Sequence, residues 1–279
     1  MSGTLYLVPT PIGNLGDISP RCRETLERAD FIAAEDTRVS LRLLNHLGLK
    51  KPLVSYYEHN KRESGKRIAQ RLLAGESCAL VTDAGTPAIS DPGEDLVRIC
   101  AENEIPVCAI CGPCAAVTAL AVSGLPTERF CFEGFLSVNK KSRRAHLDAL
   151  RGETRTMLFY EAPHKLAATL SDLRDVFGGE RRVSLCRELT KLHEEVLRLT
   201  LDEAVRRCED VPPRGEYVLV VAGAGQPQND GVSEEAALAR ARTYLQNGMS
   251  KKDAARLAAE ETGFSKNALY EKIKQNETD

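Results

Sequence analysis

The residues best suited to chemistry lie in one stretch, Asp83 to Gly93, with the sequence DAGTPAISDPG. Asp83 offers a carboxylate that can pair with an amine or accept a hydrogen bond from a ribose hydroxyl, and Gly85 lets the backbone approach a ligand closely. The stretch follows an apolar run at 78–82 that predicts a strand, and a helix is expected from Glu94. Open α/β sheets bind ligands beyond the carboxyl ends of their strands, so this loop is a candidate site. An ordinary strand-to-helix connection is the alternative interpretation.

Four other predicted strands also end in polar or turn-forming residues. Their endings have the sequences TPIGN (10–14), EDTR (35–38), EHN (58–60) and GPCAA (112–116). Because the carboxyl ends of parallel strands meet at one edge of a sheet, we expect these five loops to lie together. That coincidence favours a ligand site over a set of plain connections.

The order of elements predicts the α/β fold class. Strands are expected at 4–8, 31–34, 53–57, 78–82 and 106–111. They alternate with helices, one of which starts at Pro20 after the N-cap Ser19, and strict alternation predicts a parallel sheet covered on both faces. A second α/β domain with a mixed sheet should follow, with strands at 130–135, 156–160, 183–186, 196–200 and 217–222. Helices are expected at 66–74 in the first domain and at 166–177 in the second.

The end of the chain predicts a separate helical domain. Residues 223–232 are polar and typical of a linker. Helices are expected at 234–245, from Ser250 with Asp253 as its capping box, and after the N-cap Ser265. Two short helices around a glycine turn favour a helix-turn-helix, and a dimerisation or packing appendage is the alternative. The expected domains are therefore 1–113, 114–224 and 233–276.

Composition limits the classes of function. The formal net charge of −2 gives no general indication of a nucleic-acid partner. No apolar run approaches the roughly 20 residues that span a bilayer, and the start lacks a signal-peptide pattern, so we expect no membrane association and a cytoplasmic location. Nine scattered cysteines fit reduced thiols. Cys108, Cys111 and Cys114 form a C-x2-C-x2-C run, but Pro113 interrupts it and no fourth cysteine is near, so we expect no metal.

Phosphate-binding motifs are absent from the sequence. There is no GxGxxG after the first strand and no GxxxxGK[ST] anywhere. This disfavours NAD, FAD and ATP as ligands and leaves a nucleoside without phosphate possible.

Nine motifs occur along the chain in one order: VPTPIGNLGDI, DTR, YYEHN, VTDAGTPAISDPG, GPCAA, EGFL, FYEAPHK, RELTKLHEE and GEYVLVV. Together they resemble the tetrapyrrole-methylase superfamily of S-adenosylmethionine-dependent methyltransferases, over roughly residues 4–223. The tail resembles the small helix-turn-helix domain of some members. The resemblance is closest to the bacterial branch that methylates the ribose 2′-oxygen of a cytidine in 16S ribosomal RNA. Cys114 stands where Ser is usual, which affects only a hydroxyl contact.

The resemblance implies a class III methyltransferase with two α/β domains and the donor S-adenosylmethionine in the cleft between them. It also implies a homodimer and the small ribosomal subunit as partner. We expect Pro11, Pro87 and Ile89 to flank the adenine. The residues that match the family's donor-binding loops are Thr10, Pro11, Asp83, Ala84, Gly85, Thr86, Ile89, Ser90, Cys114, Ala115, Tyr160 and Glu161.

Methyl transfer to a ribose hydroxyl calls for a general base, because a hydroxyl is a weak nucleophile. The candidates at the cleft are Glu161, His164, Lys165, Glu188 and Lys191, and the sequence singles out none of them. Structural roles are the alternative: Glu161 could cap the next helix, and Glu188 could pair with a neighbouring arginine.

The chain has a net charge of −2, so any RNA must be bound by local clusters of positive charge. The candidates for RNA contact are Lys140, Lys141, Arg143, Arg144, Arg187, Lys191 and Lys266, with Arg151 and Arg155 extending the first cluster and Lys272 and Lys274 the last. A solvated helix face is the alternative for such a run. Two other functions stay open, a tetrapyrrole methyltransferase of the same superfamily and a ligand-sensing regulator that binds nucleic acid.

Overall fold

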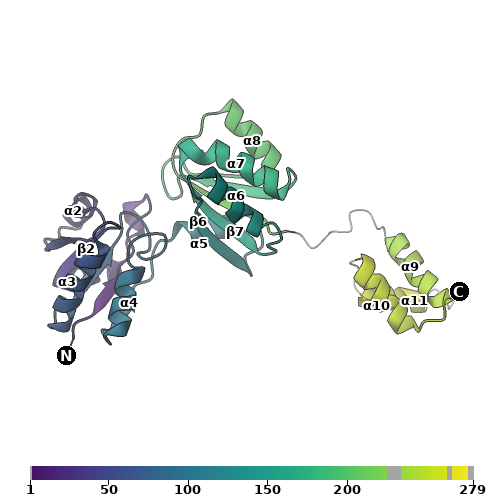
Figure 1. Cartoon of the computed structure of the whole chain (residues 1–279), viewed down its shortest axis with the longest axis horizontal. Coiled ribbons are helices and arrows are strands. Elements are labelled where there is room, and N and C mark those ends of the chain that lie inside the picture. Colours follow the sequence, from purple (N-terminus) through teal and green to yellow (C-terminus); the bar gives the residue numbers. More distant parts are fainter. Residues whose placement is uncertain (1, 225–233, 263–265, 276–279) are drawn as a thin grey trace. The chain divides into compact units, whose positions relative to one another are not determined.

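The computed structural model describes residues 2–224, 234–262 and 266–275, which fall into two compact units divided after Gly223 (Figure 1). The first unit holds two five-stranded sheets with their helices, and the second holds three helices. The expected linker and the N-cap Ser265 lie outside the described residues, apart from Gly223 and Ala224 at the start of that linker.

The first sheet is parallel throughout, as predicted, with the strand order β3-β2-β4-β1-β5. Its strands are β1 (Leu5–Leu7), β2 (Phe31–Ala34), β3 (Leu53–Ser55), β4 (Cys78–Val81) and β5 (Val107–Ala109). All five carboxyl ends therefore lie at one edge of the sheet, where the candidate loops follow them.

Two separate cores cover the faces of this sheet, because alternate residues of a strand point to opposite sides. On one face Ile32 and Ala34 pack with α1 (Pro20–Arg28) and α2 (Thr37–His46). On the other, Phe31 and Ala33 pack with α3 (Lys61–Leu73) and α4 (Glu94–Glu102). Ser19 caps α1 as expected, since its Oγ accepts a hydrogen bond of 3.1 Å from the backbone N–H of Cys22.

Two helices begin earlier than the sequence indicates. Helix α3 starts at Lys61 rather than at residue 66, because Gly65 is buried and close to Ile99 and tertiary packing outweighs its low helix propensity. Helix α7 (Pro163–Phe177) starts at Pro163 rather than at residue 166. Proline suits the first helical position, where a missing N–H costs nothing.

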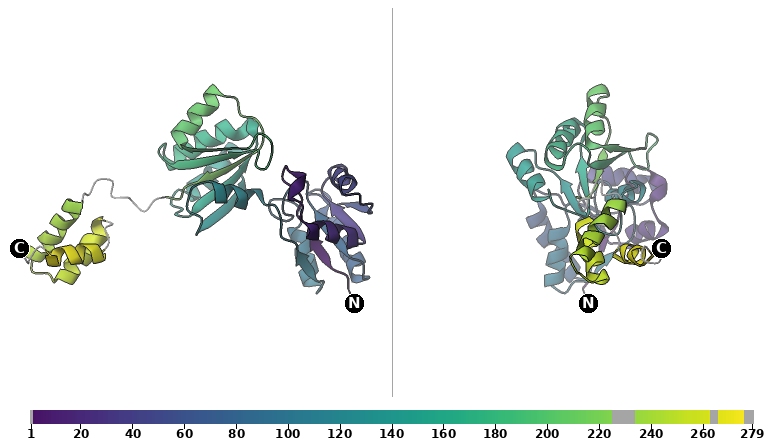
Figure 2. Two further views of the ribbon diagram at one scale, coloured as in Figure 1. Left: turned by 180° about the vertical axis from the view of Figure 1, so that it is seen from behind. Right: turned by 90° about the vertical axis from the view of Figure 1, so that its right-hand side faces the viewer.

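The second sheet is mixed, with the order β6-β7-β10-β8-β9. Its strands are β6 (Phe130–Phe135), β7 (Thr156–Glu161), β8 (Arg182–Arg187), β9 (Glu195–Thr200) and β10 (Tyr217–Val221). Only β6 and β7 are parallel, and β9 pairs antiparallel with β8 as expected. One face packs against α6 (Lys140–Ala149), α7 and α8 (Leu201–Asp210), and α5 (Ala115–Val122) packs against the other (Figures 1 and 2).

The second unit has a small core of its own. Helices α9 (Glu234–Gln246), α10 (Lys251–Thr262) and α11 (Lys266–Gln275) pack around Ala237, Ala241, Ala255, Ala258, Leu269 and Ile273. Ser250 precedes α10 as predicted: its Oγ accepts a hydrogen bond of 3.2 Å from the backbone N–H of Asp253 and donates one of 2.6 Å to the Asp253 carboxylate. Within the described part of the chain, no helix has the length and apolar character needed to cross a membrane.

Candidate functional site

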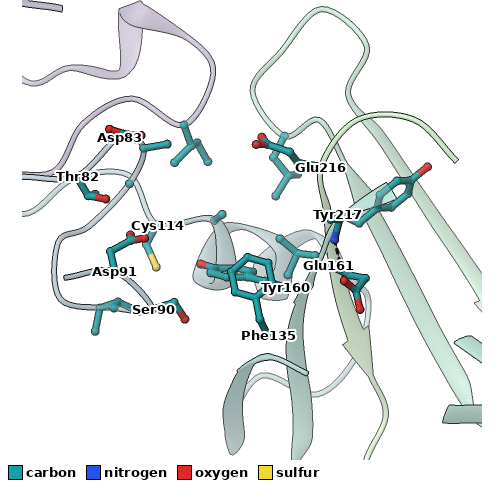
Figure 3. A pocket seen from close by; sticks show the side chains of 18 of the residues that line it. Thr82, Asp83, Ser90, Asp91, Cys114, Phe135, Tyr160, Glu161, Glu216 and Tyr217 are labelled. Atoms are coloured by element: carbon teal, nitrogen blue, oxygen red, sulfur yellow. Dashed lines mark hydrogen bonds between the residues drawn. The ribbon is translucent and has the colours of Figure 1, made fainter. Parts of the chain in front are cut away.

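A cavity of about 580 Å³ lies between the loops at the carboxyl edge of the first sheet and one end of the second sheet (Figure 3). This volume is within the range of small-molecule sites in proteins. The first-sheet side of its wall consists of Ile12, Glu35, Thr82, Asp83, Ala84, Gly85, Thr86, Ile89, Ser90, Asp91, Cys114 and Ala115. The second-sheet side consists of Phe135, Tyr160, Glu161, Ala162, Pro163, His164, Cys186, Glu188, Leu189, Lys191, Glu216, Tyr217 and Val218.

Backbone strain is concentrated in the loops around this cavity. Five non-glycine residues among the described ones have a positive φ, and four of them are Ala88, Ser90, Glu188 and Thr190, with φ between 50° and 67°. Such conformations cost about 1–3 kcal/mol each and persist at sites that need them. The loop after β4 also closes tightly, since a Cβ on Gly93 would lie 2.8 Å from the Ala88 Cβ.

Hydrogen bonds tie three of the strand-end loops together at the first sheet's edge. The backbones of Thr10 and Gly85 exchange two hydrogen bonds of 2.9 and 3.0 Å. The Thr10 hydroxyl donates to the carbonyl of Thr82 at 3.1 Å, and the Thr86 hydroxyl donates to the carbonyl of Pro113 at 2.8 Å. The loops after β1, β4 and β5 therefore form one rigid wall.

Three carboxylates give the first-sheet end of the cavity a negative charge. Burial, reinforced by the charges of Glu35 and Asp83, raises the pKa of Asp91 to about 6. Burial also raises the pKa of Asp83. The Thr82 hydroxyl donates a hydrogen bond of 2.8 Å to Glu35 and fixes that side chain. A cationic ligand bound beside these side chains would favour the ionised forms of Asp83 and Asp91.

Apolar side chains form a second region of the cavity wall. The rings of Phe135 and Tyr160 lie 5.4 Å apart between centroids, and the Tyr160 hydroxyl accepts a hydrogen bond of 3.2 Å from the backbone N–H of Ala116. Phe135 is 59% exposed and Ile89 is 44% exposed, so both present uncovered surface to the cavity. Planar aromatic groups pack well on such surfaces.

A lysine is held between two carboxylates on the second-sheet side. Lys191 Nζ donates to Glu188 at 2.9 Å and to Glu216 at 2.8 Å. Burial opposes the charged form, but these two bonds hold the pKa of Lys191 above its ordinary value. A hydrogen bond from the Glu216 backbone, together with Lys191, lowers the pKa of Glu188. Both side chains are therefore charged at neutral pH.

Glu161 is buried, and its two carboxylate oxygens already have partners. One oxygen accepts from the backbone N–H of Ala162 at 2.9 Å, and the other accepts from the Thr169 hydroxyl at 2.5 Å. These bonds fix the Glu161 side chain beside the start of α7, but the N-cap of that helix is Ala162, without a side-chain cap bond, so Glu161 is not the helix cap that the sequence left open.

Most residues expected to bind the donor lie on this cavity's wall, and three expected residues do not. Thr10 and Pro11 line a neighbouring second cavity, and Pro87 lines neither cavity. Of the candidate bases, Glu161, His164, Glu188 and Lys191 line the wall and Lys165 does not. The role of each residue stays a prediction.

The cations expected to contact RNA are mostly engaged with carboxylates. Arg143 donates to Asp172 at 2.6 Å, and both side chains are largely buried. Arg144 lies 3.5 Å from Asp148, and Arg187 donates to Glu195 at 3.2 Å. Arg151 and Arg155 pair with Asp148 and Glu153. Lys140, Lys141 and Lys266 are exposed.

The sequence did not single out several residues that line the cavity. The main ones are Glu35, Asp91, Phe135 and Glu216. Glu35 and Asp91 lie in the polar strand endings that marked the site, so a signal for them existed. To select them, one has to know which carboxylates the fold brings to the cavity wall, and a sequence motif does not contain that information.

The fold and the cavity together have the features of an α/β methyltransferase. Both β-sheets of the α/β unit contribute residues to one cavity. The cavity wall combines an acidic region with an apolar one, and this combination suits a cationic nucleoside such as a sulfonium methyl donor. Among the described residues, no group of three His, Cys, Asp or Glu side chains is arranged to hold a metal ion.

The chain belongs to the tetrapyrrole (corrin/porphyrin) methylase family, whose sequence model matches residues 4–205. A second model, the RsmI C-terminal HTH domain, matches residues 232–273. Among solved structures, uroporphyrin III C-methyltransferase from Thermus thermophilus is similar with a TM-score of 0.57 at 14% identity. The match covers 79% of this chain and 97% of that one, and shows the shared fold.

Curated relatives are similar over the full length. A protein of Synechocystis is 46% identical over 99% of both chains, and one of Pseudomonas aeruginosa is 48% identical over 99% of this chain and 98% of its own. Both carry the name ribosomal RNA small subunit methyltransferase I. The predicted superfamily and α/β fold are thus confirmed, as are the methyltransferase class and S-adenosylmethionine as the donor.

Proposed function

We propose that this protein transfers a methyl group from S-adenosylmethionine to the 2′-hydroxyl of a cytidine ribose in small-subunit ribosomal RNA. The observation that carries the proposal is the cavity, which is acidic in one region and apolar in another. The substrate is proposed because relatives that are 42–48% identical over nearly their full length carry the name ribosomal RNA small subunit methyltransferase I. The donor supplies a methyl group that is already activated by its sulfonium.

The donor's amino and sulfonium groups belong at the acidic region of the cavity. Asp83 and Asp91 supply negative charge there, and the strained loop that carries them is preorganised around Gly85. The apolar surfaces of Ile89, Phe135 and Tyr160 suit the adenine ring. Burial raises the pKa of Tyr160 to about 12, so its phenol stays neutral beside the ligand.

Asp91 is the best-suited base for the ribose hydroxyl. In the protein without donor, its pKa of about 6 leaves it ionised at neutral pH and more basic than an ordinary carboxylate. Lys191 is held protonated, the pKa of Glu188 is lowered, and the oxygens of Glu161 are both occupied. We place the hydroxyl proton on Asp91, with His164 of the same wall as the second candidate base. The rigid walls of the cavity supply the alignment that in-line displacement needs.

The test uses small ribosomal subunits from a strain that lacks the gene, with a labelled methyl donor. Label at a ribose 2′-oxygen of a cytidine is the expected result. Label on a base, or on an added tetrapyrrole and not on the subunit, contradicts the proposal. Free ribosomal RNA in a parallel reaction shows whether the assembled subunit is the substrate.

We also propose that the active form is a homodimer that works in the cytoplasm, where ribosomal subunits assemble. Several large apolar side chains of the first unit are exposed, among them Leu192 at 93% and Val138 at 73%, and a subunit contact would bury such surface. A mass measurement in solution tests this directly. A monomer at the concentration of the activity assay contradicts it.

A further inference from the structure

A second cavity of about 300 Å³ shares Thr82 and Asp83 with the first. Its remaining wall is formed by Thr10, Pro11, Leu15, Val39, Ser40, Arg42, Leu43 and His46. The apolar members come from the loop after β1 and from α2, and Leu15 is 47% exposed. A space of this size with apolar walls suits one flat aromatic group.

Helix α2 presents a stripe of basic residues beside this cavity. Arg38, Arg42 and His46 are spaced four residues apart, so they lie on one face of the helix, and all three are exposed. The helix sequence TRVSLRLLNH contains no carboxylate. Arg42 has no ion pair among the described residues, and Arg42 and His46 also line the second cavity.

Arg38 links this stripe to the first cavity. Its guanidinium donates to Asp36 through Nη2 at 2.6 Å and through Nε at 3.0 Å, and the backbone N–H of Asp36 donates to the Asp83 carboxylate at 3.1 Å. The Arg38 side chain nevertheless stays 88% exposed. A guanidinium that is fixed in direction but uncovered can stack on a nucleobase or bind a phosphate.

Lys140 and Lys141 of α6 are exposed too, so the comparison with α6 depends on its arginines and on the position of each helix relative to the donor site. On α6, Arg143 and Arg144 lie beside carboxylates that neutralise them, and Arg143 is largely buried. On α2, Arg42 is exposed and forms no ion pair with a described residue, so its charge is available to a ligand. The α2 stripe also adjoins a cavity that shares two residues with the methyl-donor site.

We propose that the stripe of Arg38, Arg42 and His46 and the second cavity bind the RNA segment next to the methylated nucleotide. Arg42 holds a phosphate, and the uncovered guanidinium of Arg38 stacks on a base while it stays paired with Asp36. One unstacked nucleobase enters the cavity, as is common when proteins bind single-stranded RNA. The inference rests on the proposed function and adds the surface that holds the acceptor. It gives the first domain a role in RNA binding that the sequence assigned to α6, to Arg187 and Lys191, and to the tail.

The test compares two charge reversals of equal size on opposite faces of the first sheet. Arg42→Glu lies on α2, and the control Arg62→Glu lies exposed on α3. The substrate is the unmethylated small subunit, and the donor dissociation constant is measured separately by calorimetry. Arg42→Glu should raise KM for subunits about tenfold or more, because it removes a phosphate contact and adds a charge that repels phosphate. Donor affinity should stay within twofold, because Arg42 does not line the donor cavity.

Two further variants keep the test decisive. Arg42→Gln should reduce the slope of log affinity against log salt by about 0.7–0.9, the value of one phosphate contact. Val39→Phe should fill the cavity and raise KM with donor affinity unchanged. Equal KM values for Arg42→Glu and Arg62→Glu overturn the inference. Inactivity of the wild-type protein on subunits contradicts the proposed function instead.

Discussion

Asp91 links the electrostatics of the cavity to the stability of the protein. Its pKa in the folded protein is about 6, against an ordinary 3.8, because of burial and the nearby charges of Glu35 and Asp83. The folded state thus binds this proton more tightly than the unfolded state, and stability falls as pH rises through 6. The difference corresponds to roughly 3 kcal/mol at most, and partial exposure screens it to about 1–2 kcal/mol.

Asp91→Asn should therefore stabilise the protein at pH 8 by about 1–2 kcal/mol in the free energy of unfolding. The gain should shrink through pH 6 and vanish below pH 4, where Asp91 is neutral in both states. Urea unfolding without the donor, at pH 8, 6 and 4, measures this. The same variant should bind the donor more weakly and lose methyl transfer, since it lacks the charge and the proposed base.

Asp95→Asn is the matched control, because hydrogen bonds from Arg98 and Lys61 lower the pKa of Asp95. That variant should lose stability at pH 8, the opposite sign. Equal unfolding free energies of wild type and Asp91→Asn at pH 8 would refute the electrostatic reasoning. So would a gain that persists unchanged at pH 4.

Three other predictions address the donor site, a predicted RNA contact and the tail. Asp83→Ala should weaken donor binding in calorimetry at least several-fold with the fold intact, because it removes one of the charges that face the cation. Arg143→Ala should lower the free energy of unfolding by about 3–5 kcal/mol, since it leaves the buried Asp172 unpaired, and should spare RNA affinity once folded. A chain that ends at Gly223 should bind the donor normally, because the second unit has its own core, and should show a higher KM for subunits.

Each of these has a control and a contradicting outcome. Unchanged donor affinity in Asp83→Ala removes Asp83 from the donor site. Replacing both Arg143 and Asp172 by leucine should restore much of the stability, and a double variant as unstable as Arg143→Ala argues against the ion pair as the cause. If the shortened chain methylates subunits with an unchanged KM, the tail is dispensable for RNA binding.

The sequence by itself determined the fold class and the place of the site. Strict alternation of strands and helices indicated the parallel first sheet, and the polar strand endings located the edge where the cavity lies. The spacing of apolar residues and the caps at Ser19 and Ser250 are local properties, so they can be deduced from neighbouring residues. The ordered motifs indicated the family, which the comparisons confirmed.

Only the tertiary structure decided how the charged residues are used. Asp91 and Arg143 differ in role because the fold half-buries Asp91 near other carboxylates and pairs Arg143 with Asp172, which is distant from it in sequence. Lys191 is held by Glu216, 25 positions away. The basic stripe of helix α2 lies beside the second cavity, and part of that cavity's wall is formed by the loop after β1, which is distant from α2 in sequence. Burial and partnership depend on long-range packing, and they determine which charges remain available for a ligand.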